Sequence, residues 1–590
     1  MEPIVGIDLG TTNSEIAVIR DGRPEVIRSD GEAILPSIVG LDPEGRLLVG
    51  TPARNQWLLA PERTVRSIKR KMGEDYAVRL GDRDYAPQEI SAIILGRLKE
   101  WAEQFLGQPV HKAVITVPAF FNEVQREATR EAGELAGLEV VRIINEPTAA
   151  ALTYDPDTEN LERLLVYDLG GGTFDVSIVQ IERGVVEVLA SHGDTHLGGD
   201  DFDQLLLDYV CDEFAKEHKI DLRKSLVAKS RVLNAVEEAK KVLSAEAVAT
   251  IQEEFIAEIS GAALHLDLEI ERHEYETLIE PLLAKTLTCV DQSLDDAHLN
   301  AQQIDKVILV GGASRTPLVH RLLERRLGRE LHTEVDPDLC VAMGAAVQGG
   351  LINGIDVGPV LVDITPHTLG ISALGNLHGM ISEHHFAPVI HRNTPLPTTR
   401  SEMFSTAYDR QEEAMISVYQ GENEDVRHNQ FIGEFMLEGL SEVRAGNEIL
   451  VRFGLDLNGI LKVTAEEHAT GLQKQLTVEN AVSRFRRESQ PGGTGTALRQ
   501  PLDVVSSPTT SDQGAGSEAN VPADVAAAIA NSSALISKAL GLAGKASEED
   551  RQEIDRLVKD LMEASAARSI PRLEQVGAVL EDLVFYLQDA

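Results

Sequence analysis

A strand-and-turn unit that occurs twice constrains the fold of this chain more than any other feature. An apolar run at 4–7 is followed by DLGTT at 8–12, and a second apolar run at 164–167 is followed by DLGGGT at 168–173. Short runs of β-branched and aliphatic residues are typical of buried strands, so each turn should lie at the carboxyl end of a strand. Glycines there let backbone N–H groups approach phosphate oxygens, and the aspartates can hold a hydrated Mg²⁺. One such turn is weak evidence for a phosphate site, but two predict related lobes with a nucleotide between them.

A third strand-like run, at 307–310, ends in paired glycines. Gly311 and Gly312 follow it directly, and Arg315 comes shortly afterwards. Glycine backbone can lie against a flat base and a guanidinium can stack on it, so this segment predicts a floor for adenine. The alternative, a tight turn with a surface arginine, is weakened by the presence of the two phosphate turns.

Composition excludes several classes of protein. The 590-residue chain is too long for a single core and predicts two to four domains. Its 95 acidic and 55 basic residues give a formal net charge of −40, which argues against nucleic acid, anionic membranes and acidic clients as partners. Cys211, Cys289 and Cys340 lie far apart without metal-ligand spacing, so neither a disulfide framework nor a zinc site is expected. Because we find no 18-residue apolar run and the N-terminus enters a strand at once, we expect a cytoplasmic protein with no membrane partner.

The first part of the chain has the pattern of an α/β domain. Strand-like and helix-like segments alternate over residues 1–356, for example a strand at 113–117 and a helix at 124–135. This part contains all three glycine-rich turns, so it is expected to be the nucleotide-binding half.

The pattern changes beyond residue 357. Period-two alternation of apolar and polar residues dominates 412–422 and 449–465, and Asn458-Gly459 lies between two such runs. Asn-Gly between alternating runs is a strong hairpin signal. An antiparallel β domain is therefore expected here.

The last hundred residues divide into two kinds of segment. Residues 486–520 are rich in Gly, Ser, Thr, Pro and Gln and predict a flexible linker. Helix-forming residues return beyond Pro522, with apolar stripes at 554–561 and 573–587. These stripes predict a small helical bundle, with a coiled-coil dimer as the alternative.

Four motifs in this sequence resemble those of the DnaK-type heat-shock chaperones, the seventy-kilodalton class. They are GIDLGTTNS at 6–14, RIINEPTAAA at 142–151, DLGGGTFD at 168–175 and GDTHLGG at 193–199. The resemblance covers roughly residues 1–485 and is specific, whereas the duplicated turn alone would indicate only the wider actin, sugar-kinase and chaperone ATPase fold. It implies a multidomain chain made of an α/β actin-like two-lobed ATPase domain at 1–356, an interdomain linker at 357–364 and an antiparallel β-sandwich for peptides at 365–485. Composition and apolar patterning add a flexible linker at 486–521 and a short α-helical C-terminal region at 522–590.

The resemblance also implies an activity. A protein of this kind is an ATP-dependent molecular chaperone of the stress response that binds and releases unfolded or extended polypeptides as it hydrolyses ATP to ADP and phosphate. A J-domain co-chaperone is an implied partner, and the exchange factor is left open. The rival interpretations are a dedicated adaptor for a few partners, a small-molecule kinase of the actin fold and an actin-like polymer. A β domain after the ATPase is not needed by a kinase and would obstruct the stacking of a polymer.

The nucleotide site is implied residue by residue. By resemblance, Lys69, Glu146, Thr173 and Asp175 are catalytic, and Asp8 and Asp168 hold Mg²⁺ through water, accompanied by K⁺. The alternatives are a solvated helix lysine for Lys69 and buried structural ion pairs for the two acids Glu146 and Asp175. The nucleotide-binding set implied by the resemblance is Gly10, Thr11, Thr12, Asn13, Gly170, Gly171, Gly172, Thr173, Glu237, Lys240, Lys241, Ser244, Gly311, Gly312, Arg315 and Asp338. Within it, the four residues from Glu237 to Ser244 recur at i, i+3, i+4 and i+7 on one helical face, which without the resemblance would indicate a solvated charged face.

Two further sets of residues are implied by resemblance. The peptide cleft is assigned to Ile371, Ala373, Leu374, Phe404, Ala407, Ala414 and Ile416, with sandwich core as the alternative for Phe404 and Ile416 in particular. Coupling between the domains is assigned to the relay of Pro118 and Arg126 and to the co-chaperone surface of Arg142, Asn145, Thr148 and Asp363.

Several departures from the family pattern are visible. Gly358 and Pro359 interrupt the linker, and because proline lacks an N–H, we expect weaker strand pairing and loose coupling unless the docked strand begins at Val360. The segment at 71–88 is short, and a long helical lid is replaced by a linker and a short tail. These features make the chain look closest to the compact bacterial HscC-like branch of the family.

Overall fold

The chain divides into two compact units, Met1–Val504 and Val505–Ala590. The computed structural model describes residues 2–154, 161–329, 331, 336–355, 357–477, 556–557 and 559. Apart from the last three of these residues, the predicted linker at 486–521 and the predicted helical region at 522–590 lie outside the described part. All elements of the site belong to the first unit.

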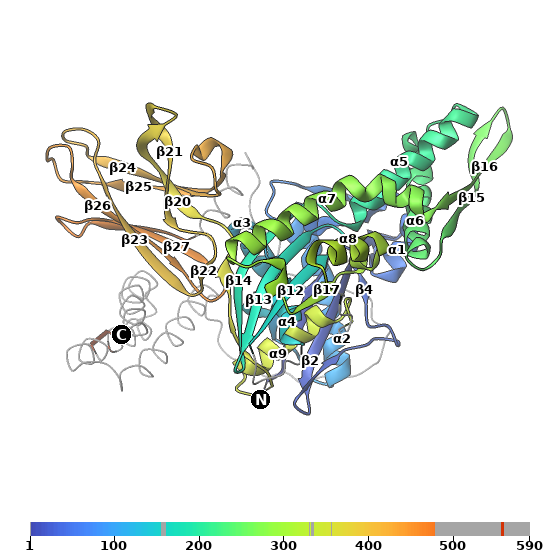
Figure 1. Ribbon diagram of the computed structural model, residues 1–590, viewed down its shortest axis with the longest axis horizontal. Helices are drawn as coiled ribbons and strands as arrows, with labels where there is room; N and C mark the ends of the chain where they lie inside the picture. Colours follow the sequence, from blue (N-terminus) through green and yellow to red (C-terminus); the bar gives the residue numbers. More distant parts are fainter. Residues whose placement is uncertain are drawn as a thin grey trace, which may run out of the picture. The chain divides into compact units, whose positions relative to one another are not determined.

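The first lobe is built on a mixed sheet with strand order β11-β10-β1-β2-β3, in which β4 also pairs with β2. Figure 1 labels β2 and β4 of this sheet. β1 is parallel to β10 and antiparallel to β2. The predicted strand at 113–117 and helix at 124–135 are confirmed as β10 and α3, and Asn122 caps α3 by accepting the backbone N–H of Gln125 at 2.9 Å. The main elements are β1 (Ile4–Leu9), β2 (Asn13–Arg20), β3 (Arg23–Val26), β4 (Leu35–Pro36), α2 (Pro87–Leu106), β10 (Lys112–Val117), α3 (Glu123–Leu135) and β11 (Glu139–Asn145).

Smaller elements form the outer part of this lobe. They are β5 (Val39–Leu41), β6 (Leu47–Val49), α1 (Thr51–Trp57), η1 (Pro61–Arg63), β7 (Thr64–Val65), η2 (Ile68–Lys71), β8 (Val78–Leu80) and β9 (Arg83–Tyr85).

The second lobe repeats the arrangement, with strand order β17-β12-β13-β14-β18. β12 is parallel to β17 and antiparallel to β13, as β1 is to β10 and β2. Its elements are β12 (Glu162–Leu169), β13 (Phe174–Glu182), β14 (Val185–Asp194), α5 (Gly199–His218), η3 (Leu222–Lys224), α6 (Leu226–Ala245), β15 (Val248–Ile259), β16 (Ala262–Glu271), α7 (Arg272–Asp296), η4 (Ala301–Gln303), β17 (Lys306–Val310), η5 (Gly312–Arg315), α8 (Pro317–Leu327) and β18 (Val360–Val362).

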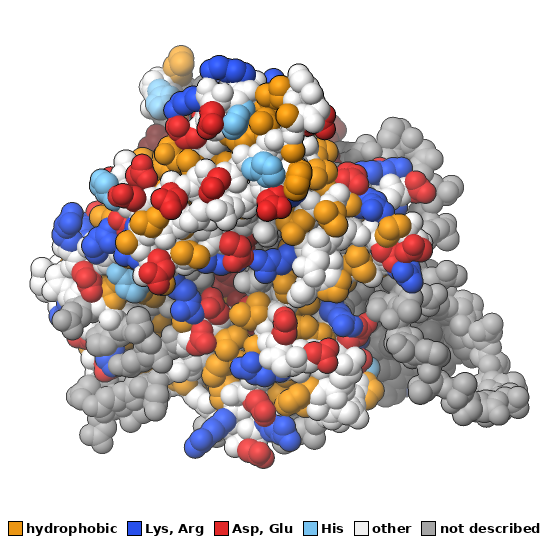
Figure 2. Space-filling view, turned by 90° about the vertical axis from the view of Figure 1, so that its right-hand side faces the viewer, with side chains coloured by type: hydrophobic (Ala, Val, Ile, Leu, Met, Phe, Trp, Pro, Cys, Tyr) orange, Lys and Arg blue, Asp and Glu red, His pale blue; other side chains and the backbone are white. Residues whose placement is uncertain are grey.

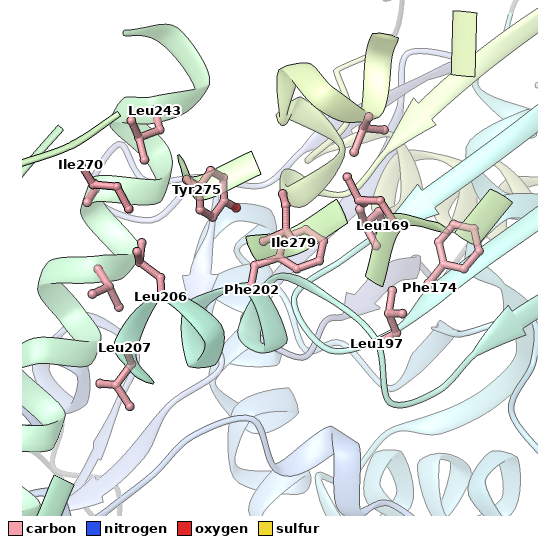
Figure 3. Close-up of a cluster of buried hydrophobic side chains, with 14 of the residues drawn as sticks. Leu169, Phe174, Leu197, Phe202, Leu206, Leu207, Leu243, Ile270, Tyr275 and Ile279 are labelled. Atoms are coloured by element: carbon pink, nitrogen blue, oxygen red, sulfur yellow. The ribbon is translucent and has the colours of Figure 1, made fainter. Parts of the chain in front are cut away.

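The core of the second lobe holds its phosphate turn in place. Leu169, the second residue of the DLGGGT motif, and Phe174, which follows it, are buried with apolar residues of α5 and α7 (Figure 3). Burial of several large side chains at about 2 kcal/mol each fixes the turn against these helices. The residues drawn and labelled there are Leu169, Phe174, Leu197, Phe202, Leu206, Leu207, Leu243, Ile270, Tyr275 and Ile279.

Two helices with small side chains lie between the lobes. α4 (Glu146–Leu152) and α9 (Cys340–Ile352) contribute to a core that contains residues of both sheets. A Cβ on Gly344 would lie 1.8 Å from the carbonyl oxygen of Ala149, and one on Gly6 would lie 2.1 Å from the amide nitrogen of Ala346. Backbone therefore lies directly on backbone at both places, and only glycine fits.

The β domain consists of two four-stranded antiparallel sheets, β21-β20-β24-β25 and β23-β26-β27-β28. The predicted hairpin is confirmed: β26 and β27 pair from Leu455↔Leu461, and Gly459 in the turn has a φ of 76°. Its elements are β19 (Ile364–Thr365), β20 (Leu369–Leu377), β21 (Met380–Ile390), β22 (Thr394–Pro395), β23 (Thr398–Ser405), β24 (Glu413–Gln420), η6 (Val426–His428), β25 (Gln430–Glu438), β26 (Glu448–Leu455), β27 (Leu461–Glu467) and β28 (Gln473–Thr477).

The linker forms the edge strand β18 of the second lobe. β18 pairs in parallel with β14, and Val360 donates its N–H to the carbonyl of Gly184 at 2.9 Å. Pro359 precedes the first paired residue, so its missing N–H is not part of the ladder. The expectation that Pro359 would weaken this pairing is wrong for that reason, and the alternative, a strand that begins at Val360, is confirmed.

The surface carries both signs of charge. On the face shown in Figure 2, Asp and Glu side chains are interspersed with Lys and Arg among the described residues, and no continuous basic area is seen there. Among the described residues, no helix is both long and apolar enough to cross a membrane.

Candidate functional site

Four acidic side chains meet a buried lysine between the two lobes. Asp8 lies at the end of β1, Asp168 near the end of β12, Asp175 at the start of β13, and Glu146 is the first residue of α4. Nζ of Lys69, in η2, lies 2.5 Å from Oε1 of Glu146. Lys69 is only 2 % exposed, so its alternative interpretation as a solvated helix lysine is wrong.

The electrostatics of this cluster favour the uptake of positive charge. Burial, followed by the charge of Glu146, raises the pKa of Asp175 to about 7 and holds the pKa of Asp168 well above its ordinary value. The same two causes raise the pKa of Asp8 to about 7, while Lys69 opposes the rise at all three aspartates. Carboxylates crowded in this way bind a cation or a proton readily.

The two phosphate turns face each other across the cleft. A Cβ on Gly171 would lie 1.9 Å from Oγ1 of Thr12, and one on Gly172 would lie 2.6 Å from Cγ2 of Thr11. Oγ1 of Thr12 is buried and has no hydrogen-bond partner among the described residues. A buried, unpartnered hydroxyl is costly, so this group is available to a ligand. The structure thus brings together the turns at 8–13 and 168–173.

The residues assigned to ribose and adenine lie on α6 and η5. Nζ of Lys240 donates to Oδ2 of Asp203 at 2.8 Å and to the carbonyl of Gly199 at 3.2 Å. Nζ of Lys241 lies 3.0 Å from Oε1 of Glu237. Lys240 is therefore a partly buried partner in an ion pair with Asp203, whereas Lys241 is half-exposed and fits the charged-face interpretation as well.

The third glycine-rich turn packs against the second. A Cβ on Gly311 would lie 2.4 Å from the carbonyl oxygen of Leu169, and Gly311 has a φ of 78°. Arg315, half-exposed, donates to Oδ2 of Asp338 at 2.6 Å. This pair leaves the flat face of the guanidinium for a stacked base. Gly312 is the first residue of η5, and Ser244, in α6, donates to the carbonyl of Lys240 at 3.4 Å.

Sequence reasoning missed two residues of the cluster. Glu15 is the antiparallel partner of Asp8 in β2, as Asp175 is of Asp168 in β13. Burial, and next Asp8, keep the pKa of Glu15 well above its ordinary value. The equal spacing of seven residues in the two acid pairs could have revealed Glu15. Thr116, whose hydroxyl donates to Oδ1 of Asp8 at 2.8 Å, gave no comparable signal.

The coupling residues form a chain of hydrogen bonds from the nucleotide lobe to the linker. Arg126 donates to Oδ1 of Asn145 at 2.7 Å and to the carbonyl of Ala119, next to Pro118, at 3.0 Å. Nδ2 of Asn145 in turn donates to both carboxylate oxygens of Asp363 at 3.0 Å.

Two other residues of the co-chaperone set have unused polar groups. Burial lowers the pKa of Arg142, although Asp363 opposes it, and Nε of Arg142 is buried without a hydrogen-bond partner among the described residues. Oγ1 of Thr148 is likewise buried and unpartnered in that part of the chain.

The residues assigned to the peptide cleft divide into buried and exposed groups. Ile371, Ala414 and Ile416 belong to the core of the β domain, and Phe404 packs against it. The core interpretation therefore describes their present surroundings. Leu374, 62 % exposed, and the neighbouring position Ala373 lie towards the free end of the β20–β21 hairpin, and Ala407 is exposed.

Comparison with known proteins supplies the context for this geometry. A family model described as "Hsp70 protein" matches residues 4–80 and 76–588. Proteins named "Chaperone protein DnaK" from Thermotoga petrophila and Thermotoga maritima are each 49 % identical to this chain over 486 residues, which is 81 % of this chain and 80 % of each relative.

Proposed function

Since the chain belongs to the Hsp70 family, we propose that the acidic cluster around Lys69 positions ATP hydrolysis and that this reaction controls the grip of the β domain on extended polypeptides. The protein is an ATP-dependent chaperone, and its two-lobed part is an ATPase that binds ATP and ADP. The observation that supports the residue assignment is the meeting of two equivalent turns, from the two lobes, beside one buried lysine.

Asp8 and Asp168 are suited to hold Mg²⁺ through its water molecules. Both carboxylates lie at strand ends and can supply oxygen ligands. Burial and the nearby charge of Glu146 raise their pKa values, so a bound cation would stabilise their charged forms. Among the described residues, no three His, Cys, Asp or Glu side chains form a group that could hold a metal ion directly. A water-mediated site is consistent with this. Bound Mg²⁺ would offset charge on the phosphates, and K⁺ beside it belongs to the same proposal.

The remaining residues of the cluster divide the work of hydrolysis. Lys69 would contact the terminal phosphate and the attacking water, held in place by Glu146 at 2.5 Å. Asp175 would orient that water and accept its proton, because its pKa of about 7 allows both protonation states at neutral pH. The hydroxyls of Thr12 and Thr173, at the two facing turns, would donate to phosphate oxygens.

The residues around the linker support one partner, a J-domain co-chaperone. Arg142, Asn145, Thr148 and Asp363 would form the J-domain co-chaperone surface, supported by the hydrogen bonds that join Asn145 to Asp363 and by the unused polar groups of the other two residues. The cytoplasmic location and membership of the compact HscC-like branch stay predictions from the sequence, as do the domain boundaries at 356, 364, 485 and 521.

Crosslinking of the full-length protein to a peptide library tests the proposal. We expect crosslinks to the β domain that persist with ADP and are lost rapidly with ATP, while an Asp168→Asn variant shows no nucleotide dependence. Crosslinks confined to a few sequences would favour the dedicated adaptor. Transfer of phosphate to a small molecule instead of water would contradict the assignment of the cluster.

A further inference from the structure

One residue of the β domain reaches the backbone beside the catalytic cluster. Phe120, which follows β10, donates its N–H to Oδ1 of Asp175 at 2.9 Å. The carbonyl oxygen of the same residue lies 3.0 Å from Nε2 of His367, which is 247 residues further along the chain, between β19 and β20. A single backbone residue thus joins a carboxylate of the nucleotide site to an imidazole of the β domain.

The direction of this hydrogen bond is fixed by chemistry. A carbonyl oxygen can only accept, so Nε2 of His367 carries the proton. Burial lowers the pKa of His367 to about 4, against the opposing effect of the Phe120 carbonyl, so the ring is neutral near pH 7 and has one N–H to donate. The charged and titratable groups that face the ring are Arg126, Glu422 and His192.

The ring of Phe120 is held from two sides. Its centroid lies 4.3 Å from that of His367, at an interplanar angle of 59°, and 5.9 Å from that of His192, at 30°. His192, on β14, is bonded through Nε2 to Oδ2 of Asp296 at 2.9 Å, and Oδ1 of Asp296 accepts from Arg392 of the β domain at 2.7 Å. The β domain is therefore linked to Phe120 in two ways: directly through His367, and indirectly from Arg392 through Asp296 and His192.

The neighbouring carbonyl groups have a different partner. Arg126, in the ATPase half itself, donates to the carbonyls of Ala119 at 3.0 Å and Phe121 at 3.2 Å. The carbonyl of Phe120, between them, is bonded by His367. The backbone at 119–121, which includes the N–H bonded to Asp175, is therefore held partly by Arg126 of its own lobe and partly by His367 of the β domain.

We propose that His367 is a positioning residue for ATP hydrolysis, which holds Phe120 so that its N–H orients the carboxylate of Asp175. The proposal rests on the role of Asp175 proposed above and extends it to a residue outside the ATPase half. The hydrogen bond from Phe120 to Oδ1 fixes the orientation of the Asp175 carboxylate and so the direction of Oδ2. Loss of that orientation slows catalysis without removing a reacting group. Through His367, the contact of the β domain with the ATPase half would therefore affect the orientation of Asp175.

The test uses single-turnover hydrolysis by the full-length protein loaded with ATP and Mg²⁺. His367→Leu removes the donor and should slow hydrolysis about fivefold, as expected for loss of one orienting hydrogen bond. His367→Gln, whose amide supplies an N–H, should restore the rate to within about twofold, and ATP affinity by titration calorimetry should be unchanged in both. His378→Leu, at an exposed position between β20 and β21, is the matched control and should hydrolyse ATP at the wild-type rate.

Other variants separate positioning from loss of docking. Arg392→Ala loosens the same face without touching Phe120 and should leave the rate closer to wild type than His367→Leu does. In an Asp175→Asn background, His367→Leu should have no further effect. Equal slowing by His367→Leu, His367→Gln and Arg392→Ala, faster hydrolysis in His367→Leu, or an undiminished effect in the Asp175→Asn background would each overturn the proposal. A wild-type rate for Asp175→Asn alone would instead overturn the proposed role of Asp175, and this inference with it.

Discussion

Replacement of Lys69 by alanine tests the centre of the site. Its ammonium group is buried, lies 2.5 Å from Glu146 and opposes the raised pKa values of Asp8, Asp168 and Asp175. Lys69→Ala leaves these four carboxylates without that cation and without the group assigned to the terminal phosphate.

Two effects of different size should follow. We expect single-turnover hydrolysis to slow by at least about tenfold, which corresponds to roughly 1.4 kcal/mol of barrier. The apoprotein should also unfold more easily, because removal of one partner of a buried ion pair costs about 3–5 kcal/mol. Lys71→Ala is the matched control on the same short helix: Lys71 is half-exposed, pairs with Glu74 at 3.0 Å, and should contribute less than about 1 kcal/mol to stability and nothing to the rate.

A second variant separates chemistry from structure. Glu146→Gln in the Lys69→Ala background removes the unpaired charge, so thermal stability should recover while hydrolysis stays slow. Rates are followed by quenched flow on preloaded complexes, and ATP affinity by calorimetry should remain within a few-fold of wild type. Wild-type hydrolysis by Lys69→Ala would refute the assignment, and recovery of the rate together with stability in the double variant would show that the pair is only structural.

Four further outcomes are expected. Thr173→Ala should slow single-turnover hydrolysis about tenfold with nearly unchanged ATP affinity, and a wild-type rate would remove it from the site. Arg315→Ala should weaken ATP and ADP binding alike, since a stacked face is lost in both; unchanged ADP affinity in calorimetry would reject the adenine floor. Val360→Pro should abolish ATP-dependent changes in peptide off-rate, measured by fluorescence, whereas Pro359→Leu should not alter them, because Val360 donates to the carbonyl of Gly184 and Pro359 precedes the paired residues; equal effects would contradict the observed register. Burial raises the pKa of Glu123 from 4.5 to about 8, and the backbone N–H of Glu123 donates to Gln420 of the β domain at 3.3 Å, so protection of this amide from exchange should fall as the pH rises from 4.5 towards 8 and should fall less in Glu123→Gln; the same pH dependence in that variant would show that another group is responsible.

The repeated turns could be predicted because their signal is local. Each DLG motif follows a buried strand, and equivalent strands in two lobes place their carboxyl ends at one cleft, so the meeting of Thr12 with Gly171 follows from the repeat. The hairpin at Gly459 is likewise encoded by two residues and their flanking alternation. Such features need no knowledge of how distant segments pack.

The contacts that escaped prediction depend on packing between distant segments. The burial of Lys69 is set by Glu146, 77 residues away, and a lysine on a short helix has no local mark of it. Glu15 lies between Ser14 and Ile16 in β2 and follows no glycine-rich turn, so only comparison of the two hairpins reveals it. The first residue of the linker that pairs with β14 is Val360, and this position cannot be predicted from composition, so neither can the effect of Pro359.

The contact of α4 with α9 sets how the lobes can move. Gly344 lies against the backbone of Ala149, and Gly6 against that of Ala346, so no side chain from one element is inserted into a socket of the other at these points. Surfaces of this kind can slide by small steps without any rotamer change, which is the requirement for shear motion between packed elements. Small sliding movements of α9 over α4 and β1 at these two points would therefore let the cleft between the lobes open and close without rotamer changes there.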